Sequence, residues 1–193
     1  MGEMIIREAI SRGLREALEG DDRVFLMGED IGEYEGSYAV TRGFLEDFGP
    51  ERVRDMPIAE SVIVGSAIGA AMAGLRPVVE LMTINFALLA MDQIVNHAAK
   101  LRYMSNGQLT VPITIRTVTG GGGQLGATHS QSFEGWFASV PGLKVVAPST
   151  PHDALGLLRS ALMDDNPVIY AEHALLYSSK GEVPDEWFDV PIG

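Results

Sequence analysis

The chain has 193 residues, 46% of them apolar, which suits one large domain with a substantial core and leaves little room for two. Its 26 acidic and 14 basic residues give a formal charge of -12, which argues against a nucleic-acid-binding surface because such a surface needs a basic stripe. The absence of cysteine excludes disulfides, thiolate metal sites and a cysteine nucleophile. The N-terminus has no signal-peptide pattern and the glycine-rich apolar run 62–75 is too short to span a bilayer, so a cytoplasmic protein without membrane contact is expected.

Hydrophobic periodicity predicts helices that alternate with strands along the chain. Thr41 is expected to cap a short helix, and Ser149 or Thr150 to cap a later one that has Pro151 at its first position. The predicted strands are 24–27, 52–55, 77–81, 111–116, 143–146 and 168–170. The predicted helices are 6–18, 41–48, the apolar run after Glu60, about 87–103, a short one around 136–137, and 151–163.

This alternation predicts an α/β fold, a doubly wound and mainly parallel sheet with helices on both faces. The predicted domain covers 1–177, and the polar stretch 178–193 is expected to be a tail or linker toward a further domain that is absent. Ligands of such sheets bind beyond the carboxyl ends of the strands. Four segments fall at that edge, namely 28–30, 58–60, 82–86 and 120–129, and we expect them to share one rim.

Two residues of this rim have the chemistry of a reactive site. Glu60 is the one charge at the mouth of an apolar helix, where burial of a carboxylate is costly unless it is used. His129 follows a run of four glycines and precedes a polar pair, which suits a group that a substrate must reach. The other histidines have the positions of structural or surface residues, and none has the spacing of a zinc site. Phosphate-loop and serine-hydrolase motifs are also absent.

The apolar helix after Glu60 has a face almost without side chains, formed by Gly65, Gly69 and Ala73 at intervals of four. Such a face allows another backbone to approach closely. Two interpretations remain open here: tight packing of the helix on its own sheet, or a contact with a second subunit.

Several segments together resemble the beta subunit of thiamine-diphosphate-dependent 2-oxoacid dehydrogenases, and in particular its N-terminal, pyrimidine-binding domain. These are GEDIG at 28–32, PIAE at 57–60, AMAGLRPVVELMTINF at 71–86, DQIVNHAAKLRYMS at 92–105, HSQS at 129–132 and PGLKVVAPSTPHDA at 141–154. The similarity covers nearly the whole chain and includes the spacing of the segments.

The resemblance implies a role for each candidate residue. Glu60 would bond the aminopyrimidine ring nitrogen of thiamine diphosphate and favour its imino tautomer. Phe86 would stack on the pyrimidine, with Ile58 and Met82 lining its pocket and Glu29 on the rim beside it. His129 would face the substrate and either bind the oxoacid or assist acyl transfer to a lipoyl group.

The resemblance also implies ions and partners. A monovalent cation such as K⁺ would be held largely by main-chain carbonyls at Ile113, Ala161, Leu162, Asp164 and Asn166. The chain lacks the GDG motif that would bind Mg²⁺ and the diphosphate, which in the family belongs to the alpha subunit. An alpha subunit, a lipoyl acyltransferase core, and a dimer or heterotetramer are therefore the expected partners.

The expected activity is oxidative decarboxylation of a 2-oxoacid, followed by acyl transfer to lipoamide, in an oxidoreductase that needs its partner subunit. The MTINF loop resembles the members of the family that use pyruvate or acetoin, so pyruvate is the expected substrate. Two alternatives stay open: a non-catalytic assembly fragment of that family, and a fragment similar to transketolase or deoxyxylulose-phosphate synthase.

Overall fold

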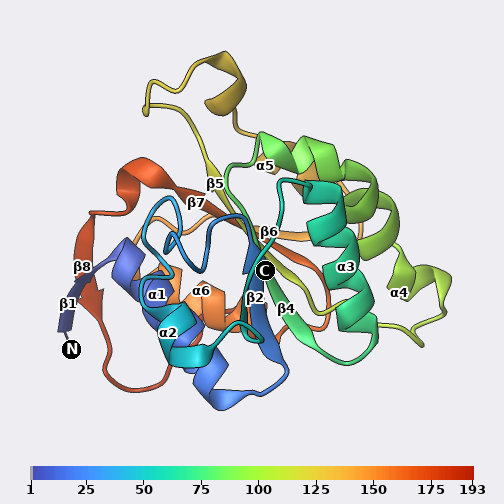
Figure 1. Ribbon diagram of the computed structural model, residues 1–193, viewed down its shortest axis with the longest axis horizontal. Helices are drawn as coiled ribbons and strands as arrows, with labels where there is room; N and C mark the ends of the chain where they lie inside the picture. Colours follow the sequence, from blue (N-terminus) through green and yellow to red (C-terminus); the bar gives the residue numbers. More distant parts are fainter. Residues whose placement is uncertain (1) are drawn as a thin grey trace.

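The computed structural model describes residues 2–193 and contains a six-stranded, wholly parallel sheet, as the sequence predicts. Its strand order is β3-β2-β4-β5-β7-β6 (Figure 1). The chain therefore starts the sheet in its interior and extends it in both directions, as doubly wound sheets do. The strands are β2 (Val24–Gly28), β3 (Val53–Asp55), β4 (Arg76–Leu81), β5 (Thr114–Thr119), β6 (Lys144–Val146) and β7 (Val168–His173).

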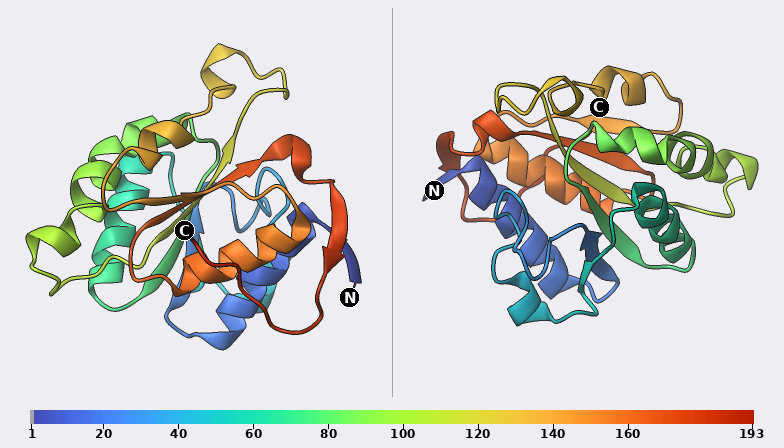
Figure 2. Two further views of the ribbon diagram at one scale, coloured as in Figure 1. Left: turned by 180° about the vertical axis from the view of Figure 1, so that it is seen from behind. Right: turned by 45° about the horizontal axis from the view of Figure 1, so that its top comes forward.

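Helices cover both faces of this sheet and bury two separate cores (Figure 2). On one face lie α1 (Ile6–Gly20) and α6 (Pro151–Met163), and on the other lies α3 (Glu60–Met72) with the helical segment that follows β4. Successive strand residues point to opposite faces, so Val78 belongs to the first core and Val79 to the second. This division places Glu60 and the segment after β4 on the same side of the sheet.

Two short strands from the first and last parts of the described chain form a small sheet of their own. Here β1 (Gly2–Ile5) pairs antiparallel with β8 (Lys180–Val183). Further along, Val190 donates its backbone N–H to the Gly156 carbonyl, and Arg159 lies over the ring of Trp187. Residues 178–193, which the sequence predicts as a tail, thus run along the domain and pack on α6. Within residues 2–193 no helix is long and apolar enough to cross a membrane.

One sequence prediction about a helix holds in its extent but not in its regularity, and another is wrong. The helix expected over about 87–103 is divided into a 3-10 helix η1 (Phe86–Ala90), a π-helix η2 (Gln93–Ala98) and α4 (Leu101–Met104). The wide turn forms where Gly142 packs against the Ala99 carbonyl, a tertiary contact that no hydrophobic period encodes. Thr41 does not cap a helix, because its hydroxyl donates to the Ile31 carbonyl, and α2 (Phe44–Phe48) starts after Gly43 instead.

The capping prediction for α6 is confirmed, since the Thr150 hydroxyl accepts from the Asp153 N–H and Pro151 opens the helix. The remaining elements are short: η3 (Ala127–His129), α5 (Glu134–Ala138) and η4 (Ala174–Leu176).

Candidate active site

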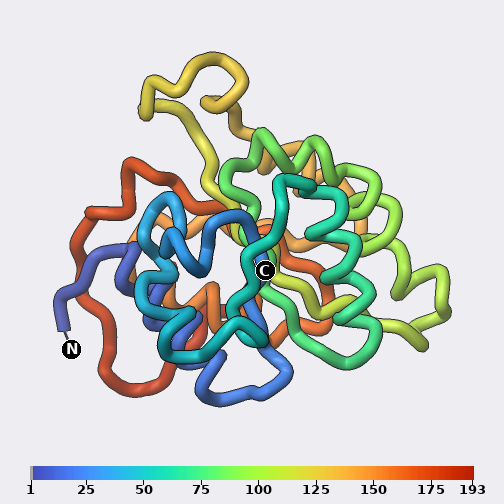
Figure 3. Tube along the Cα trace, in the orientation of Figure 1, coloured from blue at the N-terminus to red at the C-terminus, as the bar shows by residue number. Residues whose placement is uncertain are grey.

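The structure brings the four predicted segments to one edge of the sheet. They follow the carboxyl ends of β2, β3, β4 and β5, which are adjacent and parallel, so their ends meet on the same side. In Figures 1 and 3 the loop after β5, drawn in yellow, projects beyond the body of the domain at this edge. We call these residues, 28–30, 58–60, 82–86 and 120–129, the rim.

Glu60 is the first residue of α3, and only 5% of its surface is exposed. The preceding residue, Ala59, has no side chain that could cap the helix, so the first-turn N–H groups have no capping side chain. The positive end of the helix dipole favours a negative charge at this position. The arrangement therefore holds a carboxylate in a sheltered place, next to groups that support its charge.

Glu29 lies beside Glu60 and follows β2. One of its carboxylate oxygens, Oε1, is buried and has no hydrogen-bond partner among the described residues. Burial raises the pKa of Glu29, and the charges of Glu60 and Asp30 raise this pKa further. An orphaned oxygen of this kind indicates a place for a hydrogen-bonding group that the chain does not itself supply.

The acidic loop after Glu29 is fixed by a residue that sequence reasoning did not single out. The carboxylate of Asp55, at the end of β3, accepts the backbone N–H of Gly32 at 2.7 Å and that of Glu33 at 2.9 Å. This pair of bonds closes the loop over the end of the sheet. A lone aspartate at a strand end gives no pattern from which this role could be predicted.

Phe86 and His129 meet on the rim from different segments. Their ring centroids are 5.1 Å apart and the rings are edge to face, an arrangement that aromatic pairs favour. Phe86 opens η1 and is partly buried, whereas His129 ends η3 and is exposed. A flat aromatic surface and a reachable imidazole are thus adjacent, with Asn85 and Gln131 joined by hydrogen bonds beneath them.

Ile58 and Met82 differ in their surroundings. Ile58 is 84% exposed and projects from the segment before α3, while Met82 is partly buried after β4. Within this chain alone, Ile58 is therefore an exposed apolar side chain and does not line a closed pocket.

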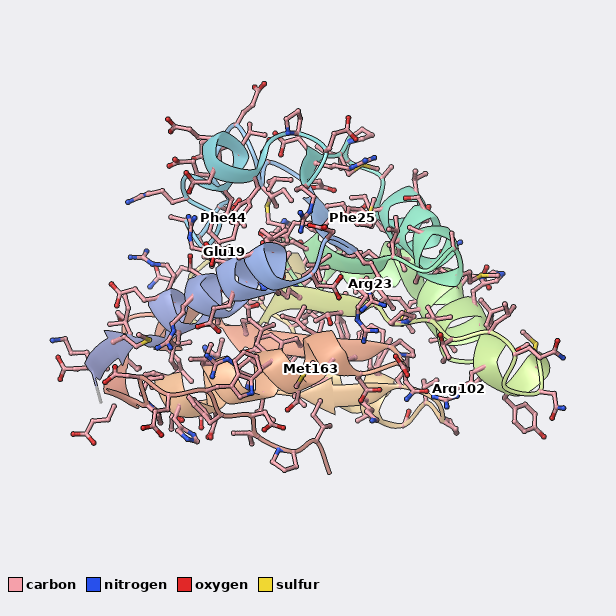
Figure 4. All side chains as sticks on the ribbon, turned by 90° about the horizontal axis from the view of Figure 1, so that it is seen from below. Glu19, Arg23, Phe25, Phe44, Arg102 and Met163 are labelled. Carbon is pink, nitrogen blue, oxygen red and sulfur yellow. The ribbon has the colours of Figure 1, made fainter. Side chains whose placement is uncertain are left out.

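The residues predicted to hold a monovalent cation lie together at the opposite edge of the sheet, which Figure 4 shows from below. The main-chain carbonyls of four of these five residues already accept hydrogen bonds. The guanidinium of Arg76 donates to the carbonyls of Leu162 and Asp164 at 3.0 and 2.8 Å, and the Thr114 hydroxyl donates to the Ala161 carbonyl at 3.2 Å. The Ile113 carbonyl accepts from the Val168 N–H, and Arg102, labelled in Figure 4, donates to the Asn166 side chain. A cation here would share its oxygens with Arg76.

Three charged residues that sequence reasoning missed form a buried cluster on the α1 and α6 face of the sheet. Arg116 donates from Nη1 to Glu80 at 2.7 Å, and from Nε and Nη2 to the two oxygens of Glu172 at 2.7 and 2.9 Å. The Tyr177 hydroxyl adds a bond to Glu172 at 2.6 Å. Burial raises the pKa of Glu80. The three residues lie far apart in the sequence, at positions 80, 116 and 172, so the cluster can be recognised only once the strands are paired.

The sequence from 3 to 180 matches the family described as "Transketolase, pyrimidine binding domain". The chain belongs to this family. It is 48% identical to pyruvate dehydrogenase E1 component subunit beta-1, mitochondrial, of Arabidopsis thaliana, over 99% of this chain and 54% of the relative. The subunit beta of Staurastrum punctulatum is 54% identical over 96% of this chain and 56% of its own, and that of Rhizobium meliloti is 48% identical over 100% and 42%.

The resemblance drawn from the sequence is thereby confirmed at the level of the family. The chain spans about half the length of the curated relatives it matches. A solved structure named "Split gene transketolase, inactive beta4 tetramer" has the same fold, with a TM-score of 0.68 and 21% identity over 95% of this chain and 54% of its own. Some relatives are named as mitochondrial, so the cytoplasmic location stays a prediction.

The pyrimidine-binding family implies thiamine diphosphate, and the rim fits one end of that molecule. Glu60 is sheltered, Glu29 has an orphaned oxygen, and Phe86 offers an aromatic face. Residues 2–193 contain no group of three or more histidine, aspartate or glutamate side chains that could hold a metal.

Proposed function

We propose that this chain supplies the pyrimidine-binding half of the active site in the decarboxylating component of a 2-oxoacid dehydrogenase. The observation that carries the proposal is the sheltered carboxylate of Glu60, at a helix N-terminus beside the orphaned oxygen of Glu29. Relatives named as pyruvate dehydrogenase beta subunits, at 48 to 54% identity, support the same function.

Thiamine diphosphate, when bound, supplies the electron sink for loss of carbon dioxide from the 2-oxoacid. The proposed task of Glu60 is to hydrogen-bond the aminopyrimidine ring nitrogen and to hold or lend a proton there, as a general acid–base group does. Phe86 would offer its face to the pyrimidine, with Met82 and Ile58 beside it. Glu29 would place its carboxyl group on the rim beside the bound cofactor.

His129 would act on the substrate side. It is exposed, lies against Phe86 and follows a glycine-rich loop, so it can reach a bound 2-oxoacid without moving the sheet. Its proposed role is to bind the oxoacid or to assist acyl transfer to the lipoyl group. Pyruvate is the proposed substrate, which corresponds to an oxidoreductase of the acetyl-transferring pyruvate dehydrogenase type.

The proposed partners follow from what the described residues do not supply. A dehydrogenase alpha subunit would hold the diphosphate and Mg²⁺, and a lipoyl acyltransferase core would accept the acyl group. Association with a second chain is supported by the open part of the small face of α3: nothing lies within 4 Å of a Cβ built on Gly69, and Ala73 is exposed, whereas Gly65 lies against Gln93 of η2 in this chain. The helix packs on its own sheet through other residues, including Ile63 and Ala67. A dimer or a heterotetramer would cover this face.

A monovalent cation, K⁺, remains part of the proposal at the turn between α6 and β7. A bound K⁺ would place a second positive charge beside Arg76. Its affinity should therefore be weak unless the carbonyl lone pairs that Arg76 does not use point toward the ion. The test is thermal denaturation in potassium chloride against choline chloride at equal ionic strength. A higher melting temperature in potassium chloride would support the cation site, and equal melting temperatures in the two salts would rule it out.

The proposed function is tested by reconstitution with the alpha subunit of a bacterial pyruvate dehydrogenase. We expect the mixture to bind thiamine diphosphate with Mg²⁺ and to reduce an artificial electron acceptor when pyruvate is added, whereas neither chain does so alone. Association without cofactor binding would support the assembly-fragment alternative. Ketol transfer from a sugar phosphate, in place of pyruvate turnover, would support the transketolase-like alternative.

A further inference from the structure

We propose that Asn85 is a positioning residue that holds His129 against Phe86. This inference rests on the proposed function for its catalytic meaning, because His129 and Phe86 are there assigned to the substrate and the cofactor. The geometry itself is a property of this chain. It follows from how one buried amide connects two loops that come from different strands.

Asn85 is firmly fixed in the turn after β4. Only 7% of its surface is exposed, and its Nδ2 donates to the Thr83 hydroxyl at 2.6 Å. The neighbouring Ile84 is fully buried, and its backbone N–H donates to the Val118 carbonyl of β5 at 2.7 Å. The turn is therefore tied to the sheet, and the amide oxygen of Asn85 has a defined position.

That oxygen receives the returning end of the glycine-rich loop. Oδ1 of Asn85 accepts the backbone N–H of Gln131 at 3.3 Å and its side-chain Nε2 at 3.1 Å. The Gln131 carbonyl in turn accepts the N–H of Gly120, at the start of the loop, at 3.4 Å. Asn85 thus fixes the point at which the loop closes, two residues after His129.

His129 has few other anchors. Residues 121–129 are all exposed, and within residues 2–193 His129 makes hydrogen bonds only with Thr128 and Gly126 of its own loop, besides its ring contact with Phe86. Phe86 is the residue after Asn85, so a single turn supplies both the aromatic surface and the fixed point of the loop. Loss of the Asn85 oxygen should release His129 from Phe86 while the sheet stays intact.

The Asn85 side chain acts here as a donor to Thr83 and as an acceptor from Gln131, and it is the acceptor that holds the loop. Leucine has nearly the same volume and can do neither, so Asn85→Leu removes both bonds to Gln131 and the bond to Thr83. Aspartate keeps an acceptor for Gln131, and the Thr83 hydroxyl can rotate to donate to it. Gln131→Ala removes only the side-chain bond and keeps the backbone one. The three variants therefore predict a graded effect.

The test uses proton NMR of the full chain and hydrogen exchange. The ring proton of His129, identified by its absence in His129→Ala, should show a ring-current shift from Phe86 in the parent. In Asn85→Leu we expect this shift to be lost and the bonded amides that close the loop, those of Gly120 and Gln131, to exchange about tenfold faster, as for loss of one or two net hydrogen bonds. Gln131→Ala should give an intermediate effect, and Asn85→Asp should restore most of the parental values.

Asn96→Leu is the matched control, because Asn96 is an exposed asparagine on η2 that bonds only Asp92 in its own helix. It should leave the His129 signal unchanged. An unchanged signal and loop exchange in Asn85→Leu would overturn the inference, as would equal acceleration in the β4 and β5 amides. If Asn85→Leu does not fold, Gln131→Ala decides alone, and a parental His129 signal there rejects the role.

Failure of the proposed function has a different signature. If the reconstituted parent does not turn over pyruvate, the proposed function fails, yet the NMR result still shows whether Asn85 positions His129. If the parent is active, Asn85→Leu should slow the acyl step as His129→Ala does and leave the cofactor affinity within about twofold. Full activity with a displaced His129 would reject the catalytic meaning of this contact.

Discussion

Glu29 and Glu60 form a pair of like-charged groups on the rim, and the charge of Glu60 adds to burial in raising the pKa of Glu29. The two residues come from the ends of adjacent parallel strands, β2 and β3, so the fold itself forces their approach. Like charges that cannot both be solvated bind a proton more readily than isolated ones. The raised pKa of Glu29 therefore places a more readily protonated carboxyl group beside Glu60 on the rim.

The first prediction concerns the stability of Glu29→Gln. The pKa of Glu29 is raised above its ordinary value of 4.5 in the folded state, so the proton is bound more tightly there than in the unfolded chain. The stabilisation that comes from this tighter proton binding by Glu29 is fully present below pH 4.5 and is lost as the pH rises through the raised pKa. Glutamine carries no charge, so Glu29→Gln should melt at a higher temperature than the parent at pH 7, with the difference vanishing near pH 4. Glu33→Gln, at an exposed position, is the control, and equal pH profiles for parent and Glu29→Gln would contradict the prediction.

The second prediction is that Glu60→Gln folds normally but abolishes cofactor activation. The change is nearly isosteric and removes only the ability to hold or lend a proton, a contribution of about 10² to 10⁴ in rate. Turnover of pyruvate by the reconstituted variant is the measurement, with circular dichroism to check the fold. Glu46→Gln, exposed on α2, should keep full activity. Parental turnover by Glu60→Gln would reject the assignment.

The third prediction separates His129 from cofactor binding. His129→Ala should bind thiamine diphosphate with the alpha subunit as the parent does, because its ring lies on the outer side of Phe86. The acyl step should slow, which single-turnover kinetics with a lipoyl acceptor would measure. His97→Ala is the control, since His97 is exposed on η2 and remote from the rim. An unchanged overall rate in His129→Ala would remove this residue from the active site.

The strands and the rim could be predicted because their signals are local. Apolar runs such as Val24 to Met27 have the composition of buried parallel strands, and parallel topology then places all their carboxyl ends on one edge. Glu60 was identifiable as the one charge in an apolar helix, and its low exposure agrees with that interpretation. The other rim residues were indicated by the segments GEDIG, PIAE and HSQS, whose sequences and spacing resemble those of a known family.

Other features are set by contacts between distant parts of the chain. At the break in the helix after β4, the backbone of Gly142 comes so close to the Ala99 carbonyl that a Cβ would not fit between them. Asn85 gave no sequence signal beyond a polar residue in an apolar segment, because its partner Gln131 lies 46 positions away. Thr41 fits a capping pattern, but in the folded loop its hydroxyl donates to the Ile31 carbonyl instead. Such choices are made by tertiary structure and not by local propensity.

The fourth prediction concerns the open face of α3. Gly69→Leu adds a side chain where nothing lies within 4 Å, and leucine favours helix over glycine by up to about 1 kcal/mol, so the isolated chain should stay folded and become slightly more stable. Association with a second chain should weaken, which analytical ultracentrifugation with and without the alpha subunit would show. Gly69→Ala adds only a methyl group and should weaken association less. Unchanged association in Gly69→Leu would place the subunit contact elsewhere.

The fifth prediction concerns the buried cluster around Arg116. Arg116→Met leaves the carboxylates of Glu80 and Glu172 buried without their cation, so the free energy of unfolding at pH 7 should fall by about 3–5 kcal/mol. The loss should shrink at acidic pH, because unpaired buried carboxylates become protonated more readily. Lys180→Met breaks an exposed pair with Glu3 and should change stability by less than about 1 kcal/mol. Urea denaturation of the three proteins at pH 5 and pH 7 measures both effects, and a loss in Arg116→Met no larger than in Lys180→Met would show that the cluster does not stabilise the sheet.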